Sequence, residues 1–189
     1  VLLEYRSHLV PDLLGVQLEP VEVEAGDHVL DPEVLAAGRV VRTGEVTLRA
    51  VREQVGVAEP RLALCALNPH AGEQGLFGDE ESRVLAPAAK RLGAAGPLPA
   101  DTVFGRAMRG EFDAVLAPYH DVGMTAIKVA SFGSGVNVTL GLPFVRTSPD
   151  HGTAFDIAGH GHANPASLIE ALKLADTLSA SRAQAAAGP

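Results

Sequence analysis

The feature that most constrains this chain is a set of short apolar runs, each ending in a turn rich in glycine and polar residues. One run covers residues 61–67 and is followed by Asn68-Pro69-His70-Ala71-Gly72-Glu73. Another covers residues 113–118 and is followed by Tyr119-His120-Asp121-Val122-Gly123. We interpret these runs, and residues 136–140, as buried strands. Strands that end in such turns are where α/β proteins carry their chemistry.

The segments between these strands have helical patterns, so the chain alternates strand, turn and helix. This alternation predicts an α/β sheet that is at least partly parallel. Helices are predicted over 43–55, from about 79 to 92, over 124–129, and after Asn164 as N-cap. In the last helix the predicted buried face is Leu168, Ala171, Leu172 and Ala175. Short strands are predicted over 16–19 and 21–24, a helical turn at 31–33, a stiff connector over 97–102 and a frayed tail from Ala180.

Composition indicates a folded domain and excludes one class of partner. The chain has 189 residues, of which 47% are hydrophobic, so it can bury a sizeable core. Tryptophan is absent, and the core must therefore be built from Val, Leu and Ala. The net charge of −8 argues against a nucleic-acid partner, because neutralising phosphates needs a basic face.

Cysteine usage and hydropathy indicate a cytoplasmic protein. Cys65 is the only cysteine, lies in an apolar run and is expected to be a buried hydrophobe. No apolar stretch approaches the ~20 residues of a membrane helix, and no signal-peptide pattern is present at the N-terminus. The chain begins at Val1 rather than Met, which is compatible with a fragment.

The two histidines that follow predicted strands are candidate metal ligands. Two imidazoles from neighbouring strand ends, His70 and His120, can share a divalent cation with a carboxylate such as Asp121 beside them. Fifty residues separate the histidines in sequence. The alternative, that both are turn histidines bonded to backbone carbonyls, stays open on spacing alone.

A second group of residues suits an anionic ligand. Lys128, Asn137 and Arg146 combine two cations with an amide, which fits a phosphate or carboxylate, although ordinary surface charge is the alternative. The loop 150–154 could wrap a cofactor with backbone donors and Thr153. Neither phosphate-binding glycine fingerprint occurs, since Gly159-His160-Gly161-His162-Ala163-Asn164 lacks the third glycine.

Five segments together resemble the 4-hydroxythreonine-4-phosphate dehydrogenase family of pyridoxal 5′-phosphate (vitamin B6) biosynthesis. They are L-N-P-H-A-G-E (67–73), G-P-L-P-A-D-T-V-F (96–104), Y-H-D-V-G (119–123), V-N-V-T-L-G-L-P-F-V-R-T-S (136–148) and D-H-G-T-A (150–154). The resemblance runs from about Val57 to about Leu178, in the family's order. It implies an isocitrate/isopropylmalate dehydrogenase-like fold of two α/β/α lobes, here mostly the second lobe, in a homodimer.

The resemblance also implies roles for individual residues. His70 and His120 match two of three metal-binding histidines, for Zn, Mg, Co or Mn. Lys128, Asn137 and Arg146 match substrate-binding residues. Asp101 and Asp121 match acidic residues near the metal, so we assign catalytic roles to them and to Lys128. The NAD-binding residues implied are His151, Gly152, Thr153, Ala154 and Asn164.

The implied reaction is NAD-dependent oxidation of 4-phosphooxy-L-threonine followed by decarboxylation to an aminoacetone phosphate. Relatives that act on a threonate or erythronate 4-phosphate share the same motifs, so that substrate class is an alternative.

Several N-terminal family motifs are absent from this sequence. It has no G-D-P-A-G-I-G-P-E, P-I-N-K, G-H-T-E or T-T-H-x-P-L, and the last of these supplies the third metal histidine. His8 only superficially echoes that motif and is not assigned as a ligand. We therefore interpret residues 1–56 as a partial first lobe, 57–180 as the family-matching lobe and 181–189 as a frayed tail. A catalytically silent binding lobe is the remaining alternative.

Overall fold

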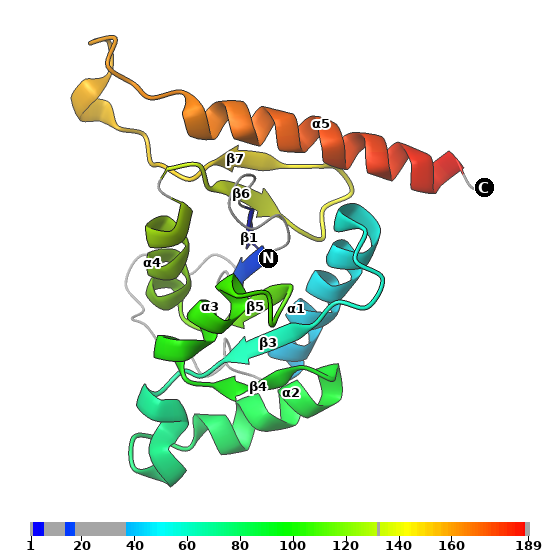
Figure 1. Ribbon diagram of the computed structural model, residues 1–189, viewed down its shortest axis with the longest axis vertical. Coiled ribbons are helices and arrows are strands. Elements are labelled where there is room, and N and C mark those ends of the chain that lie inside the picture. Colours follow the sequence, from blue (N-terminus) through cyan, green and yellow to red (C-terminus); the bar gives the residue numbers. More distant parts are fainter. Residues whose placement is uncertain (1, 6–13, 18–36, 132, 188–189) are drawn as a thin grey trace.

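The computed structural model describes residues 2–5, 14–17, 37–131 and 133–187, which form a mixed seven-stranded sheet with helices on both faces (Figure 1). The strand order is β4-β3-β5-β2-β1-β6-β7. The strands are β1 Leu2–Tyr5, β2 Leu14–Gln17, β3 Leu62–Cys65, β4 Ala95–Leu98, β5 Ala114–Ala117, β6 Val136–Thr139 and β7 Thr147–Pro149.

Helical segments connect the strands. They are α1 Ala37–Ala50 with its π-helical end η1 Val51–Val55, the 3-10 segment η2 Pro69–Gly75, the π-helical η3 Glu81–Leu85, α2 Ala86–Leu92, α3 Ala100–Met108, α4 His120–Ser131, η4 Phe155–Ile157 and α5 Ala166–Ala187. The predicted helices over 43–55 and 79–92 are confirmed, although α1 begins earlier, at Ala37. The short helix predicted over 124–129 is part of the longer α4.

The sheet is parallel on one side and antiparallel on the other. β3 pairs in parallel with both β4 and β5, and β5 pairs in parallel with β2. β1 is antiparallel to β2 and β6, and β7 is antiparallel to β6. The predicted partly parallel α/β sheet is therefore confirmed.

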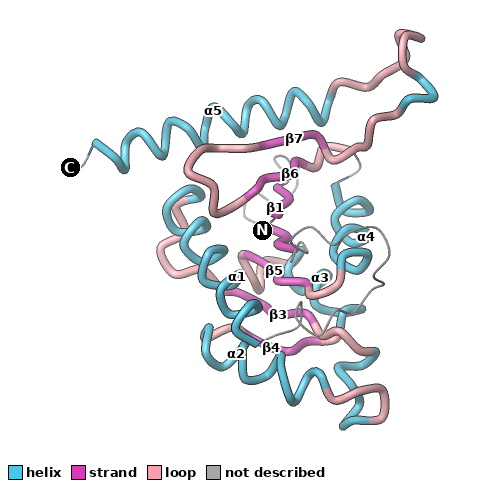
Figure 2. Tube along the Cα trace, turned by 180° about the vertical axis from the view of Figure 1, so that it is seen from behind, coloured by secondary structure: helices cyan, strands magenta, loops and turns pink. Residues whose placement is uncertain are grey.

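The central strands are apolar throughout because both of their faces are buried. In β3, Leu62 and Leu64 face the core under α1 and α2, whereas Ala63 and Cys65 face the core under α3. In β5, Ala114 and Leu116 face the first of these cores and Val115 and Ala117 the second. This two-sided burial explains why the strands read as continuous apolar runs. Helices α1 and α2 cover one face of the sheet (Figure 2). Burial raises the pKa of the Cys65 thiol to about 12, with a smaller contribution from the nearby Glu81, as expected for a structural cysteine.

Helix α1 packs through one stripe of small and β-branched residues. Val40, Gly44, Thr47 and Val51 are buried at helical spacing. A Cβ atom at Gly44 would collide with the Leu92 side chain of α2, so the glycine leaves room for that side chain.

Three short strands of the structure are not among the predicted elements. β1, β4 and β7 were not predicted, and residues 97–98 of the expected connector belong to β4. Its sequence, Ala-Gly-Pro-Leu, has the composition of a turn. β4 tolerates Pro97 because it lies at the sheet edge, and it is held by the Ala66 N–H donating to the Leu98 carbonyl at 2.8 Å.

The predicted packing of the last helix is wrong in part. Ala171 is buried, but Leu168 and Leu172 are 46% and 63% exposed, and the other buried positions are Ser167 and Leu178. The helix lies along β7 and η1, and these neighbours select the buried face from a sequence in which apolar and polar residues are spread around the helix. The tail predicted to fray from Ala180 is helical to Ala187.

Other predictions concern residues that the structure does not describe. The strand over 21–24, the helical turn at 31–33 and His8 lie outside the described residues. Within the described part, β1 and β2 belong to the same sheet as the later strands, and α1 contributes to the same core. The division into two lobes stays a prediction. Among the described residues, no helix has the length and apolar character needed to cross a membrane.

An ion pair with three hydrogen bonds joins the starts of β3 and β5. The Asp113 carboxylate is buried and accepts from the Arg61 backbone N–H at 2.6 Å, from Arg61 Nε at 3.0 Å and from Arg61 Nη2 at 2.7 Å. The Arg61 side-chain hydrogen bonds, against the opposing effect of burial, hold the pKa of the Asp113 carboxyl below its usual value.

We expect Asp113→Ala to lower the free energy of unfolding by about 2 kcal/mol, because it removes the acceptor of the Arg61 backbone N–H and of two hydrogen bonds from the Arg61 side chain. Urea denaturation measures the change. The matched control is Asp79→Ala. Asp79 forms an exposed ion pair with Arg83, with 3.3 Å between Oδ1 and Nε, and its removal should lower the free energy of unfolding by no more than about 0.5 kcal/mol. Equal losses in the two variants would contradict this interpretation.

Candidate functional site

Three neighbouring strands carry predicted site residues just beyond their carboxyl ends. β4, β3 and β5 are adjacent and parallel, so the turns that follow them open at one edge of the sheet. These turns lead to Asp101, His70 and His120, respectively, and all three residues are exposed. β3 points to the left in Figure 1, and the chain beyond it forms the coil at the lower left. The topology thus brings these three residues to one edge.

The turn that carries His70 is left-handed. His70, Ala71, Gly72, Glu73 and Gln74 have φ angles of 52°, 55°, 79°, 41° and 58°. This geometry costs roughly 1–2 kcal/mol for each residue other than glycine. Only Gly72 is a glycine, so the turn is strained. Backbone strain of this kind persists where the surrounding structure holds it, and it clusters at functional sites.

A buried carboxylate holds the start of this turn. Glu81 is 6% exposed, and its Oε1 accepts from the backbone N–H groups of Leu67 at 2.9 Å and Asn68 at 2.7 Å. The Asn68 side chain donates to Glu81 Oε2 at 2.9 Å and to Glu80 Oε2 at 2.7 Å. Burial alone would raise the pKa of the Glu81 carboxyl, but the hydrogen bonds from Asn68 and Leu67 outweigh it and lower that pKa.

The sequence predicts a helix from about residue 79 to 92 but gives no role to Glu81 in holding the turn before it. An acidic residue just before the buried pair Val84 and Leu85 was the available signal.

The His70 ring is oriented by two neighbours in its own loop. Its Nδ1 lies 3.3 Å from Glu73 Oε2, and Phe77 packs edge-on with ring centroids 6.3 Å apart. With Nδ1 directed at a carboxylate, Nε2 is the nitrogen suited to a metal or a substrate oxygen.

The two aspartates open helices beside the histidines. Asp101 is in the first turn of α3, which packs against η2, so it lies on the His70 side of the edge. His120 begins α4, and Asp121 follows it. The Tyr119 hydroxyl donates to Asp121 Oδ2 at 3.3 Å, and the charge and hydrogen bonding of Asp121 raise the pKa of Tyr119. Carboxylates in a first helical turn are stabilised by the helix dipole.

The donor set suits a divalent metal in chemistry but not in arrangement. Imidazole is a good ligand for zinc and similar cations. Within the described ranges, however, no group of three histidine, cysteine or acidic side chains is arranged to hold a metal ion. The described part therefore provides two candidate ligands, His70 and His120, without a third.

The predicted substrate-binding residues are more widely spread. Lys128 is exposed near the end of α4, which leads to the amino end of β6. Asn137 is half-buried on β6, and its Oδ1 has no hydrogen-bond partner among the described residues. Arg146 precedes β7 at the opposite end of β6, where its Nη1 donates to Thr139 Oγ1 at 2.7 Å. The structure does not bring Arg146 together with Lys128.

The predicted cofactor loop begins where β7 ends, at the amino end of β6. Ser167, which the sequence analysis missed, fixes it by donating to the Gly135 carbonyl at 2.8 Å and accepting from the Asp150 N–H at 2.9 Å. His151, Gly152, Thr153 and Ala154 are exposed. Asn164 Oδ1 accepts from the Ala166 N–H at 3.0 Å, so Asn164 caps α5 as predicted.

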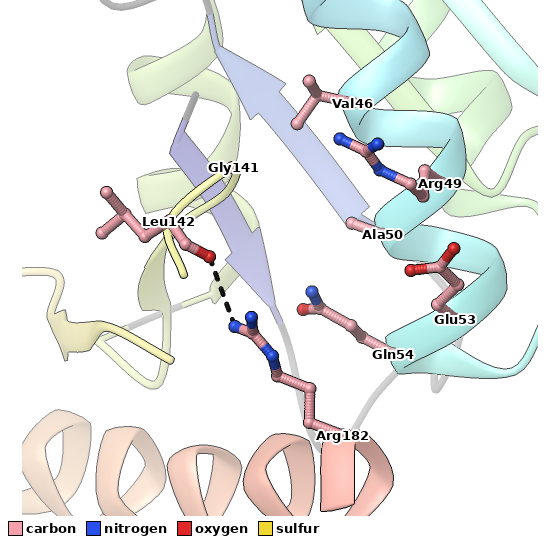
Figure 3. Close-up of a pocket in the computed structure, with 8 residues that line it drawn as sticks. All are labelled: Val46, Arg49, Ala50, Glu53, Gln54, Gly141, Leu142 and Arg182. Atoms are coloured by element: carbon pink, nitrogen blue, oxygen red, sulfur yellow. Dashed lines mark hydrogen bonds between the residues drawn. The ribbon is translucent and has the colours of Figure 1, made fainter. Parts of the chain in front are cut away.

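A cavity of about 390 Å³ lies away from these turns (Figure 3). It is bordered by α1, η1, α5 and the connection between β6 and β7, and Arg49, Gln54 and Arg182 face it. Arg182 is anchored by donating to the carbonyls of Leu142 and Pro143 at 3.3 and 2.9 Å. None of the predicted site residues lines it.

The fold is of the isocitrate and isopropylmalate dehydrogenase-like class of α/β proteins, as comparison with solved structures shows. The 4-hydroxythreonine-4-phosphate dehydrogenase of Klebsiella pneumoniae is 39% identical with a TM-score of 0.72, over 95% of this chain and 53% of that one. A terephthalate 1,2-cis-dihydrodiol dehydrogenase from Burkholderia xenovorans is 29% identical with a TM-score of 0.64, over 93% of this chain and 55% of that one.

The chain belongs to the PdxA family, described as pyridoxal phosphate biosynthetic protein PdxA, whose profile matches residues 31–175. It is 51% identical to the 4-hydroxythreonine-4-phosphate dehydrogenase of Caulobacter vibrioides, over 80% of this chain and 47% of the relative. The Paracoccus denitrificans enzyme of the same name is 52% identical, over 95% of this chain and 61% of the relative. The chain thus spans about half the length of the curated relatives it matches. The resemblance inferred from the five sequence motifs is confirmed.

The hydrogen bonds to Glu81 should be lost in acid. Because its folded-state pKa lies below the unfolded value of about 4.3, the stabilisation is complete above that value and disappears as the pH falls through the folded pKa. We expect the amide-exchange protection of Leu67 and Asn68 to stay constant from neutral pH down to about pH 5. It should then decrease as the pH drops below about 4. The control is the Ala66 amide, which donates to the Leu98 carbonyl. Parallel loss at all three amides would contradict a local role for Glu81.

Proposed function

We propose that this chain carries the metal, substrate and cofactor residues of an NAD-dependent 4-hydroxythreonine-4-phosphate dehydrogenase of vitamin B6 synthesis. The observation that supports this most strongly is the emergence of His70, Asp101 and His120 at one edge of the sheet. These residues lie within a family match that covers most of the chain.

The reaction would begin with oxidation of the secondary alcohol of 4-phosphooxy-L-threonine. NAD⁺, when bound, would accept a hydride from the carbinol carbon, and Asp121 or Asp101 would take the hydroxyl proton as the base. The product is a β-keto acid. Its carboxylate then leaves as CO₂, and protonation of the resulting enolate gives the aminoacetone phosphate.

The cationic residues would offset the charge of this substrate. Lys128 and Arg146 would face its phosphate and carboxylate, and Lys128 would also stabilise the enolate. Asn137 Oδ1 has no hydrogen-bond partner among the described residues, which supports a polar ligand at β6, since a buried acceptor without a donor is unfavourable. Because Arg146 lies at the far end of β6 from α4, these residues would contact different parts of the ligand.

We further propose that His70 and His120 supply two ligands to a divalent metal, with the remaining ligands coming from outside the described residues. Such a cation would lower the pKa of the substrate hydroxyl and polarise the ketone. The loop of His151, Gly152, Thr153 and Ala154, with Asn164, would contact NAD through backbone donors and the Thr153 hydroxyl.

The assembly proposed is a cytoplasmic homodimer. Support for a partner comes from α5, where Leu168, Ile169 and Leu172 are 46%, 45% and 63% exposed, and from Phe155, which is 81% exposed. Light scattering of the purified chain, which should give twice the monomer mass, tests the dimer. The buried cysteine supports a reducing compartment.

Two alternatives have support of their own. The similarity to a terephthalate dihydrodiol dehydrogenase indicates that the fold serves other substrates, so a threonate or erythronate 4-phosphate remains a candidate. Exposure of the site side chains and the lack of a third metal ligand in the described part favour a catalytically silent binding lobe.

A turnover assay separates these proposals. With Zn²⁺ or Mg²⁺ present, the chain should reduce NAD⁺ with 4-phosphooxy-L-threonine, and Lys128→Ala should lower kcat/KM about 100-fold because a charge-stabilising contact is lost. The matched control is Lys90→Ala, which removes an exposed lysine of α2 and should leave the activity unchanged. NADH absorbance gives the rates. Turnover only with the threonate or erythronate phosphate would favour the related dehydrogenase, and binding without any turnover would favour the silent lobe.

A further inference from the structure

The left-handed turn at His70 needs an explanation beyond its own sequence. Four of its five left-handed residues carry side chains, which disfavour this conformation. The backbone hydrogen bonds at its two ends are long, with Ala71 N–H to the Asn68 carbonyl at 3.2 Å, Leu76 N–H to the Glu73 carbonyl at 3.3 Å and Phe77 N–H to the Gly72 carbonyl at 3.2 Å. Contacts from outside the turn therefore help to hold it.

Glu81 provides those contacts from the next helical segment. One carboxylate accepts the two backbone N–H groups immediately before the turn and the Asn68 side chain, at 2.7 to 2.9 Å. The turn also rests directly on this carboxylate, because a Cβ atom at Gly72 would lie 2.9 Å from Glu81 Oε2. The carboxylate thus bonds to the entry of the turn and lies close against Gly72 in its middle.

The geometry of the turn determines how His70 is presented. Near three residues per turn, side chains at i and i+3 lie above one another. His70 and Glu73 stand in that relation, with Nδ1 and Oε2 3.3 Å apart. If the turn relaxed to right-handed geometry, the histidine would leave the strand edge that it shares with Asp101 and His120.

We propose that Glu81 is a positioning residue, which holds the left-handed turn and thereby directs the His70 ring toward the strand edge. The inference rests on the proposed function only in treating His70 as a ligand. Glu81 itself would contact neither substrate nor metal.

The test compares Glu81→Gln with Glu80→Gln. Glutamine at position 81 keeps one acceptor oxygen, but its NH2 group would face a donor, either the Asn68 side-chain NH2 or the backbone N–H groups. Glu80, in contrast, accepts only from the Asn68 side chain and from no backbone group in the described structure. In ¹⁵N-labelled protein, we expect Glu81→Gln to shift the His70 ring signals and to reduce amide protection at Leu67 and Asn68. Zn²⁺ affinity, measured by calorimetry, should weaken about tenfold. Glu80→Gln should change each readout less than twofold.

A double-mutant cycle tests whether Glu81 acts through His70. In a His70→Ala background, Glu81→Gln should weaken Zn²⁺ binding no further, because the group that it positions is gone. A lower melting temperature in Glu81→Gln, with unchanged His70 signals and Zn²⁺ affinity, would overturn the proposal. If the variant does not fold, Asn68→Ala removes only the side-chain donor and should shift the same His70 signals. Unchanged signals in that variant would also overturn the proposal.

The cycle separates this inference from the proposed function. If His70→Ala leaves Zn²⁺ affinity unchanged, the metal role of His70 fails. Movement of the His70 signals in Glu81→Gln would then still support positioning, because that readout requires no metal.

Discussion

Parallel pairing of β3 with both β4 and β5 is the constraint on which the candidate site depends. Parallel strands send their carboxyl ends to a common edge, so residues far apart in sequence, such as His70 and His120, reach the same side of the molecule. The pairing is maintained by side chains buried on both faces and by the Arg61–Asp113 contact at the strand starts. The exposed chemistry therefore lies just beyond the carboxyl ends of strands that are buried along their whole length.

The site combines rigid support with open ligand positions. Glu81 and Ser167 are buried and satisfy backbone groups in the two loops that carry His70 and His151. The predicted ligand-binding side chains themselves are mostly exposed. This arrangement suits a binding face that is closed by another structural unit, as in a two-lobed dehydrogenase, because positioning contacts keep their geometry while the face stays accessible.

Much of the fold could be predicted from the sequence because two-sided burial produces unmistakable apolar runs, as in β3 and β5. β4 was missed because its Gly96 and Pro97 are typical of turns, and only its edge position permits them. The left-handed turn and the burial of Glu81 depend on contacts between segments, which local propensity does not contain. Roles for the site residues came from the family resemblance; the topology shows that His70, Asp101 and His120 share an edge, and that Arg146 lies apart from Lys128.

The central claim is that the folded chain carries an assembled ligand site, and thermal melting with added ligands tests it most directly. Zn²⁺, NAD⁺ and 4-phosphooxy-L-threonine would be added singly and together. A ligand at 100 times its Kd stabilises the native state by about 2.7 kcal/mol, which should raise the Tm by roughly 5–10 °C in a chain of this size. A cooperative transition whose midpoint ignores all three ligands would contradict the account.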